Sequence, residues 1–211
     1  MTVTLILASA SPARLETLRR AGVQPQVMVS GVDESVVAEP DPARLALRLA
    51  ELKGRTVAAR VQRDPAGARM VLVACDSVFE LDQVAYGKPG SADLARERWR
   101  RMSGRAGVLH TGHVVIDLTS GRETTAVAST VVEFGQMSHA DIEAYVATGE
   151  PLQVAGGFTV DGLGGAFVER VEGDPHNVVG ISLPLLRRLL AELGVAWTDL
   201  WPPVDPSPSS P

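Results

Sequence analysis

Several features that define whole classes of protein are scarce or missing in this chain of 211 residues. Its single cysteine, Cys75, excludes a disulfide framework and a zinc site built from cysteines. No apolar run approaches the roughly 18 residues that a membrane-spanning helix needs. The apolar segment 5–10 has no basic residue before it and is shorter than the hydrophobic part of a secretory signal. These absences predict a soluble, cytoplasmic protein without a membrane segment.

Positive charge and aromatic side chains are also scarce. Twenty basic residues stand against twenty-five acidic ones, which gives a net charge of -5, and the aromatic residues are three Trp, two Tyr and four Phe. A nucleic-acid-binding surface normally shows a basic surplus, so that class is disfavoured. A small anionic ligand stays compatible with the composition, because a local cluster of cations acts even inside a negative protein.

Lysine is rarer still. Of the twenty basic residues only Lys53 and Lys88 are lysines, so arginine is the default cation of this chain. A retained lysine points to a site that needs a compact ammonium group in place of a planar guanidinium. Chance is the alternative explanation for either lysine alone.

What is present is typical of one globular domain. Hydrophobic residues make up 45% and charged residues 21% of the chain, which excludes disorder as its main state. The chain is too short for two ordinary domains with separate cores. We therefore expect one domain over residues 1–201, with two lobes around a cleft. Residues 202–211 are rich in Pro and Ser and predict a disordered tail.

Hydrophobic periodicity and turn residues predict strands that alternate with helices. Strands are expected at 2–8 and 69–75, as two long strands between 108 and 134, and as two strands between 156 and 171. The expected helices, each opened by a Ser or Asp cap, are 11–22, 41–60, 91–102, 138–147 and 182–194. The long hairpin in the middle favours an α/β fold with a mixed sheet over a purely parallel one.

The turn from Ser9 to Arg14 joins the first expected strand to a helix N-terminus. Free backbone N–H groups and the positive end of the helix dipole bind phosphate readily at such a place. The hydroxyls of Ser9 and Ser11 add donors, and the forked guanidinium of Arg14 suits phosphate oxygens. The alternative interpretation is an ordinary capped turn with a solvent-exposed Arg14.

Asp76 follows an apolar strand, and Lys88 stands in the Gly- and Pro-containing turn 86–89. Ligands of open α/β sheets collect at the carboxyl ends of strands, so a carboxylate there suits general-base or metal chemistry. A cap for the following turn is the alternative for Asp76. The stiff turn would present the Lys88 ammonium at a fixed place, although the chain contains no Walker motif.

Glu34 and Glu150 are further acids in expected loops, where a solvated surface charge is the alternative interpretation. The four histidines form no H-E-x-x-H zinc signature. Ser9 and Ser11 lack the G-x-S-x-G elbow of a serine nucleophile, which disfavours covalent catalysis.

Ten short motifs occur in an order that resembles the Maf family of nucleoside triphosphate pyrophosphatases. Each motif is weak alone, but the series is specific and spans about residues 3–190. The motifs are 7–14 (LASASPAR), 32–34 (VDE), Lys53, 74–78 (ACDSV), 87–89 (GKP), 102–104 (MSG), 111–112 (TG), 148–150 (TGE), 155–158 (AGGF) and 177–180 (NVVG).

The resemblance implies an elongated mixed sheet with flanking helices and a central cleft, similar to the inosine-triphosphate pyrophosphatase fold, in a homodimer. It implies hydrolysis of a nucleoside triphosphate between the α and β phosphates with a divalent metal, Mg²⁺ or Mn²⁺. Asp76 matches the proton acceptor, and Glu34 with Asp76 would hold the metal. The residues that match the phosphate-binding side chains are Ser9, Arg14, Lys53 and Lys88.

The chain departs from the family pattern at several matching positions. Ala13 and Val154 stand where the family carries cations, Ser77 replaces a threonine and Asp161 replaces a glutamine. The positions of Ala13, Ser77 and Asp161 separate pyrimidine-preferring members from those that prefer 7-methyl-GTP, and this chain matches neither pattern. The base preference therefore stays open.

The main hypothesis is an enzyme, a nucleotide pyrophosphatase that clears non-standard or surplus nucleotides. Retention of Asp76, Glu34 and both lysines favours it. The alternative is a catalytically weak nucleotide-binding regulator of cell division, which the loss of the family lysine at Val154 favours. An RNA-binding role is disfavoured by the negative charge and the few aromatic residues.

Overall fold

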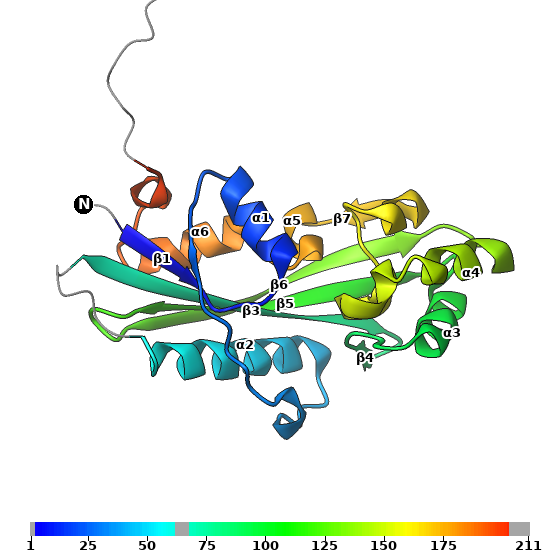
Figure 1. Cartoon of the computed structure of the whole chain (residues 1–211), viewed down its shortest axis with the longest axis horizontal. Coiled ribbons are helices and arrows are strands. Elements are labelled where there is room, and N and C mark those ends of the chain that lie inside the picture. The colour runs from blue at the N-terminus through cyan, green and yellow to red at the C-terminus, as the bar shows by residue number, and fades with distance from the viewer. Residues whose placement is uncertain (1–2, 62–67, 203–211) are drawn as a thin grey trace, which may run out of the picture.

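A mixed sheet runs the length of the molecule and forms its centre (Figure 1). The structure is a computed structural model that describes residues 3–61 and 68–202. The sheet of this described part has seven strands: β1 (Val3–Leu7), β2 (Gln26–Val27), β3 (Arg69–Leu81), β4 (Val84–Tyr86), β5 (Ala106–Asp117), β6 (Glu123–Phe134) and β7 (Val168–Glu172). The predicted tail, 202–211, lies outside the described residues apart from Pro202.

The order of the strands leaves part of one strand edge open. The order is β2-β1-β3-β5-β6-β7, with β1 parallel to β2 and β3 and the later neighbours antiparallel. β1 pairs with β3 as far as Val73, and β4 pairs with the same edge of β3 from Phe79 onward. Between these two points no strand of the described chain lies beside that edge, which leaves room for a cleft.

Helices cover both faces of the sheet and one of its ends (Figure 1). They are α1 (Pro12–Arg20), α2 (Pro42–Ala58), α3 (Ala92–Met102), α4 (His139–Ala147), α5 (Pro175–Val179) and α6 (Leu183–Glu192). Short 3-10 helices are η1 (Glu34–Val36), η2 (Glu150–Gln153), η3 (Ala155–Gly157), η4 (Leu163–Phe167) and η5 (Trp197–Leu200). α2 covers one face, α1, α5 and α6 cover the other, and α3 and α4 close the end near β4. None of the described helices combines the length and the hydrophobicity needed to cross a membrane.

The helix starts follow the predicted capping residues. Each capping side chain accepts a hydrogen bond from a backbone N–H in the first turn of its helix; these residues are Ser11, Asp41, Ser91, Ser138 and Ser182. Such a cap contributes about 1 kcal/mol to helix stability. The five predicted helices are confirmed, with ends that differ by a residue or two.

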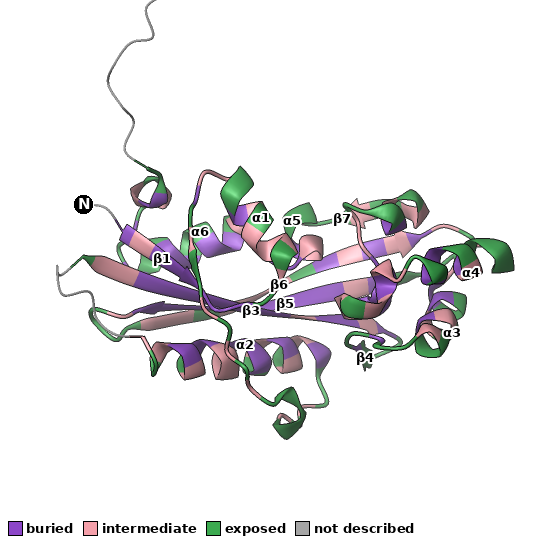
Figure 2. Cartoon of the chain, viewed as in Figure 1, coloured by how far each residue is buried: buried purple, intermediate pink, exposed green. Residues whose placement is uncertain are grey.

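Side chains of β3 alternate between the two faces of the sheet, and its centre is buried (Figure 2). Val73 and Cys75 belong to the core cluster that contains the leucines of α6. Ala74, between them, belongs to the cluster formed with α2. The same alternation turns Asp76 toward α2 and Ser77 toward the opposite face.

A glycine lets α2 approach the sheet closely. Gly112 of β5 pairs with Asp76 of β3, and a Cβ atom on Gly112 would lie 2.4 Å from the backbone oxygen of Ala46 in α2. Gly54 lets α2 pack on β3 in the same way. Because α2 lies this close, its Lys53 reaches Asp76.

Two of the predicted strands differ in the structure. The strand predicted at 69–75 continues to Leu81, because residues 71–80 pair with β5, so Asp76 lies inside β3 and not at its end. Of the two strands predicted within 156–171, the first is wrong, because residues before 168 form 3-10 turns, and the second is confirmed only from residue 168 onward, as β7. The strand predicted at 2–8 is confirmed as β1, and the long hairpin is confirmed as β5 and β6.

Candidate active site

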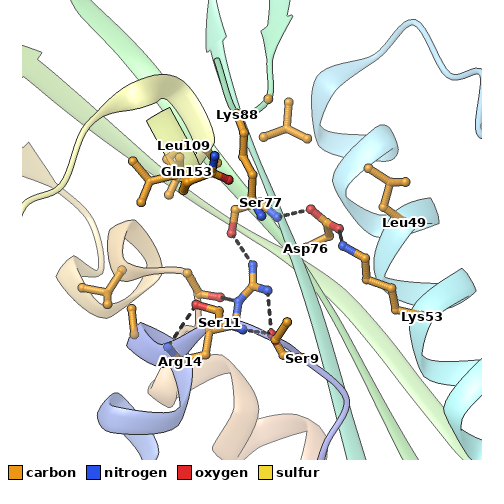
Figure 3. Close-up of a pocket in the computed structure, with 18 of the residues that line it drawn as sticks. Ser9, Ser11, Arg14, Leu49, Lys53, Asp76, Ser77, Lys88, Leu109 and Gln153 are labelled. Atoms are coloured by element: carbon orange, nitrogen blue, oxygen red, sulfur yellow. Dashed lines mark hydrogen bonds and ion pairs between the residues drawn. The ribbon is translucent and has the colours of Figure 1, made fainter. Parts of the chain in front are cut away.

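A cavity of about 750 Å³ lies where the edge of β3 is open (Figure 3). Its walls come from the turn after β1 and the start of α1, from the segment 29–34, from α2, from the middle of β3, from the turn after β4 and from the segments 153–161 and 178–180. The site residues that the family resemblance implies all line it: Ser9, Ala13, Arg14, Glu34, Lys53, Asp76, Ser77, Lys88 and Asp161. The volume is in the range of pockets that bind small molecules.

Lys53 joins two carboxylates in this cavity. Its Nζ lies 2.7 Å from Oε1 of Glu34 and forms an ion pair with Oδ2 of Asp76. Oδ1 of Asp76 accepts a hydrogen bond from the backbone N–H of Ser77 at 2.7 Å. Asp76 is only 7% exposed, so these contacts hold its carboxylate in one place. The alternative of a cap for a following turn is wrong, because Asp76 lies inside β3.

Arg14 connects three separate elements around the cavity (Figure 3). Its Nη1 donates to Oγ of Ser9 at 3.2 Å and its Nη2 to Oγ of Ser77 at 3.0 Å. Its Nε donates to the carbonyl oxygen of Gly180, directly after α5, at 2.7 Å. The alternative of a solvent-exposed Arg14 on an ordinary turn is therefore wrong. One guanidinium holds the turn after β1, strand β3 and the end of α5 together.

Two residues outside the predicted set complete this polar network. Oγ1 of Thr111 lies 2.9 Å from Oγ of Ser77 and 3.3 Å from the carbonyl oxygen of Asn177. Nδ2 of Asn177 donates to the carbonyl oxygen of Leu109 at 3.0 Å and to Oγ1 of Thr130 at 3.1 Å. Both residues belong to motifs of the family resemblance, 111–112 and 177–180, but the order of the motifs does not indicate a role for either residue.

The turn that carries Lys88 is fixed from two sides. The carbonyl oxygen of Gly87 accepts a hydrogen bond from the N–H of Gly156 at 3.2 Å and another from Nη1 of Arg98 at 2.5 Å. Lys88 is exposed in the cavity and takes part in none of the ion pairs among the described residues. Its ammonium group is therefore available to an anionic ligand.

Glu150 lies behind the wall that residues 158–161 form. Burial raises the pKa of this carboxyl, but hydrogen bonds from Thr159, from the N–H groups of Leu163 and Gly164 and from Tyr145 outweigh burial and lower the pKa below its usual value. The interpretation of Glu150 as a solvated surface charge is therefore wrong. Glu34, the other loop acid, has a half-exposed side chain and is paired with Lys53.

The carboxylates of Glu34 and Asp76 suit a divalent cation that is shared with substrate phosphates. Both carboxylates meet at one point, the ammonium of Lys53. No group of three or more His, Cys, Asp and Glu side chains that could hold a metal occurs within 3–61 and 68–202. Mg²⁺ is usually bound by one or two carboxylates together with phosphates and waters, and Mn²⁺ also prefers oxygen ligands. The donor set fits such a shared site better than an all-protein cage.

The fold and the cavity together define an α/β protein whose charged cleft suits a small phosphorylated ligand. Comparison with known proteins identifies the family within this class. The chain belongs to the Maf-like protein family, whose model matches residues 4–193. The matched range includes all the residues that line the cavity.

Relatives of high identity carry the name of an enzyme. A nucleoside triphosphate pyrophosphatase of Salinispora tropica is 57% identical over 197 residues, which are 93% of this chain and 87% of that protein. A protein of the same name from Streptomyces coelicolor is 55% identical over 201 residues, which are 95% of this chain and 96% of that protein. Among solved structures, a nucleoside-triphosphatase (dITP/XTP pyrophosphatase) from Mycobacterium abscessus has a TM-score of 0.38 and 14% identity, with 64% of this chain and 75% of that chain covered.

Proposed function

We propose that this protein hydrolyses nucleoside triphosphates to monophosphates and pyrophosphate, and so clears non-standard or surplus nucleotides. The main observation behind the proposal is that Lys53 forms ion pairs with both Asp76 and Glu34 inside the cavity. The same cavity contains the cations Arg14 and Lys88. The name shared by relatives that are more than half identical over almost the whole chain supports it.

The proposed reaction is an attack of water on the α-phosphorus. A bond forms from the water oxygen to the α-phosphorus, and the bond to the oxygen that bridges the α and β phosphates breaks. Asp76 accepts the proton that the water loses. Lys53 positions the Asp76 carboxylate through their ion pair, and the backbone N–H of Ser77 holds its other oxygen.

Negative charge grows on the pyrophosphate as it leaves, and cations already in place stabilise that charge. Lys88 supplies an ammonium that takes part in none of the ion pairs within residues 3–61 and 68–202. Arg14 supplies a guanidinium whose position is set by Ser9, Ser77 and Gly180. The backbone N–H groups at the start of α1 add the positive end of a helix dipole.

We propose Mg²⁺ or Mn²⁺ as the cofactor, with Glu34 and Asp76 as its protein ligands. When bound, such an ion neutralises charge on phosphate oxygens. Treatment with EDTA should abolish pyrophosphate release, and addition of either ion should restore it. Full turnover after exhaustive chelation would contradict this part of the proposal.

The positions that we propose to set the base preference all line the cavity. The hydroxyl of Ser77 forms hydrogen bonds with Arg14 and Thr111, so Ser77 influences a bound nucleotide through the position of Arg14. Ala13 offers no polar side-chain group, whereas Asp161 offers an exposed carboxylate. A nucleotide with a hydrogen-bond donor on its base edge suits that carboxylate.

The regulator of cell division stays the alternative, because Val154 lines the cavity where the family carries a lysine. A homodimer and a cytoplasmic location also stay predictions from the family resemblance. Sedimentation of the purified protein tests the first, and fractionation of the source cells tests the second.

Product analysis tests the proposed function. The purified protein is incubated with UTP, dTTP, CTP, GTP and 7-methyl-GTP in the presence of Mg²⁺ or Mn²⁺, and ³¹P NMR identifies the products. Monophosphate with pyrophosphate supports cleavage between the α and β phosphates, and the ranking of rates gives the base preference. Orthophosphate alone, once a contaminating pyrophosphatase has been excluded, would contradict the proposal. Tight binding without turnover would favour the regulator.

A further inference from the structure

The carboxylate of Glu150 accepts hydrogen bonds from several nearby parts of the chain. Oε1 accepts hydrogen bonds from the hydroxyl of Tyr145 at 2.9 Å, from the hydroxyl of Thr159 at 2.5 Å and from the N–H of Gly164 at 3.0 Å. Oε2 accepts a hydrogen bond from the N–H of Leu163 at 3.0 Å. Two side chains and two backbone groups from three parts of the chain therefore depend on one acceptor group.

The segment after Thr159 fits around this carboxylate without spare room. A Cβ atom on Gly162 would lie 2.7 Å from Oε2 of Glu150, and one on Gly164 would lie 2.5 Å from the hydroxyl of Tyr145. Real Cβ contacts are not this short. At 164 a Cβ atom would also lie 2.8 Å from the backbone oxygen of Thr159, so only glycine fits there, whereas at 162 the carboxylate of Glu150 would have to move. The carboxylate and the glycines thus define the path of residues 159–164 together.

The same segment forms part of the cavity wall. Phe158, Thr159, Val160 and Asp161 all line the cavity, whereas Glu150 does not. The cations and the carboxylate–lysine cluster occupy other walls, which belong to the start of α1, to η1, to α2, to β3 and to the turn after β4. If the phosphates of a nucleotide lie against those charges, its nucleoside part lies against the rest of the lining, to which residues 158–161 contribute together with 29–32, 153–155 and 178–180.

We propose that Glu150 is a positioning residue that fixes the 158–161 wall and thereby sets the affinity for the nucleoside part of the substrate. The inference rests on the proposed function, because it assumes a nucleoside triphosphate in the cavity. It assigns Glu150 no contact with the reacting atoms. A change at Glu150 therefore weakens nucleoside binding and leaves the phosphate-binding groups in place.

The substitution Glu150→Gln tests this role with little change of volume. If the oxygen of the new amide takes the Oε1 position, the NH₂ group of the amide faces the N–H of Leu163. Two donors then face each other, the hydrogen bond to Leu163 is lost, and the 158–161 wall is no longer held in place. We expect KM for the preferred nucleotide to rise about tenfold while kcat changes little, since lost ground-state binding appears in KM. Glu143→Gln is the matched control, because Glu143 is also a hydrogen-bonded carboxylate, on α4, but its partner is Arg96 and it is not among the residues that line the cavity.

Inorganic tripolyphosphate separates this role from a general loss of structure. It carries the phosphates but no nucleoside, so its inhibition constant should stay the same in Glu150→Gln as in the wild type. Tyr145→Phe and Thr159→Val each remove one donor, and they should raise KM in the same direction by a smaller factor. These milder variants test the proposal even if Glu150→Gln fails to fold.

An unchanged KM in all three variants would overturn the proposal. An equal rise in KM and in the inhibition constant of tripolyphosphate would overturn it too, because the phosphate site would then have been disturbed as well. A wild-type protein that releases no pyrophosphate from any nucleotide would refute the proposed function separately. In that case dissociation constants for a nucleotide and for tripolyphosphate, compared between the wild type and Glu150→Gln, decide the role of Glu150 by the same ratio.

Discussion

Acid should destabilise this protein through one buried histidine. His113 of β5 is fully buried, and its Nε2 accepts a hydrogen bond from the backbone N–H of Ser182 at 2.8 Å. Because a backbone N–H can only donate, Nε2 carries no proton, and Nδ1–H donates to the carbonyl oxygen of Thr111 at 2.9 Å. Ser182 caps α6, so protonation of Nε2 would break a contact at the start of that helix.

The size of the effect follows from the pKa of His113. Burial lowers this pKa from 6.5 to about 4, against a smaller opposing effect of the hydrogen bond to Thr111. Between these two values the unfolded chain binds a proton that the folded chain does not, so the free energy of unfolding decreases as pH falls. From pH 7.5 to pH 5 the decrease due to His113 is about 2 kcal/mol.

Urea unfolding at pH 7.5, 6.5 and 5 measures this contribution by comparison with His113→Gln. The amide oxygen of Gln can accept the hydrogen bond from Ser182 but does not titrate. The difference in unfolding free energy between the wild type and the variant should therefore change by about 2 kcal/mol over this range. His139→Gln is the control, because His139 is exposed and its variant should follow the wild type. Parallel pH dependences of the wild type and His113→Gln would refute the reasoning.

Three further predictions concern the cavity. Asp76→Asn should lower turnover by about 10²–10⁴-fold while the nucleotide still binds; an unchanged rate of pyrophosphate release would remove Asp76 as the base. Lys88→Met should raise the dissociation constant of a nucleoside triphosphate, measured by calorimetry, and undiminished affinity would place Lys88 outside the binding site. Gly112→Ala would put a Cβ atom 2.4 Å from the backbone oxygen of Ala46. Overpacking of this kind typically costs about 1–3 kcal/mol, so thermal unfolding should begin several degrees lower, and an unchanged Tm would show that α2 shifts freely.

Much of the local structure is predictable because its causes lie close together in the sequence. Ser138 and Asp141 stand three residues apart and form the reciprocal capping box at the start of α4. Ser11, followed by a proline, opens α1 for the same kind of reason. The two strands of the long hairpin are also neighbours in the chain, and their turn residues mark the point where the direction reverses.

The length of β3 depends on residues far away in the sequence. Asp76 and Ser77 are poor strand formers and locally indicate a turn. Their partners in β5 are Gly112 and Thr111, and this pairing continues the strand through them. The local pattern therefore predicted an end where the sheet continues.

The conformation of the segment 156–171 also involves a residue outside the segment, so the local pattern does not predict it. Its apolar residues and glycines are typical of two strands around a turn. The N–H groups of Leu163 and Gly164, which a ladder would use, donate instead to the carboxylate of Glu150. The side chain of Glu150, outside the segment, thus takes up two N–H groups that a strand at 163–164 would need.

The sequence predicts which of these side chains share one cavity, but not the contacts between them. The motifs identified Lys53 and Asp76, whereas their ion pair requires the close approach of α2 that Gly112 permits. The sequence predicts Arg14 as a phosphate ligand but not its hydrogen bonds to Ser9, to the Ser77 hydroxyl and to the carbonyl oxygen of Gly180. These contacts join residues far apart in the chain, which spacing alone does not reveal.

Attack of water on the α-phosphorus is the central claim of the proposed function. Hydrolysis of the preferred nucleotide in H₂¹⁸O tests it most directly, with mass spectrometry of both products. The account predicts one ¹⁸O atom in the nucleoside monophosphate and none in the pyrophosphate, because the water oxygen stays on the phosphorus that it attacks. Label in the pyrophosphate would contradict the account, because it would show that water attacks the β-phosphorus instead.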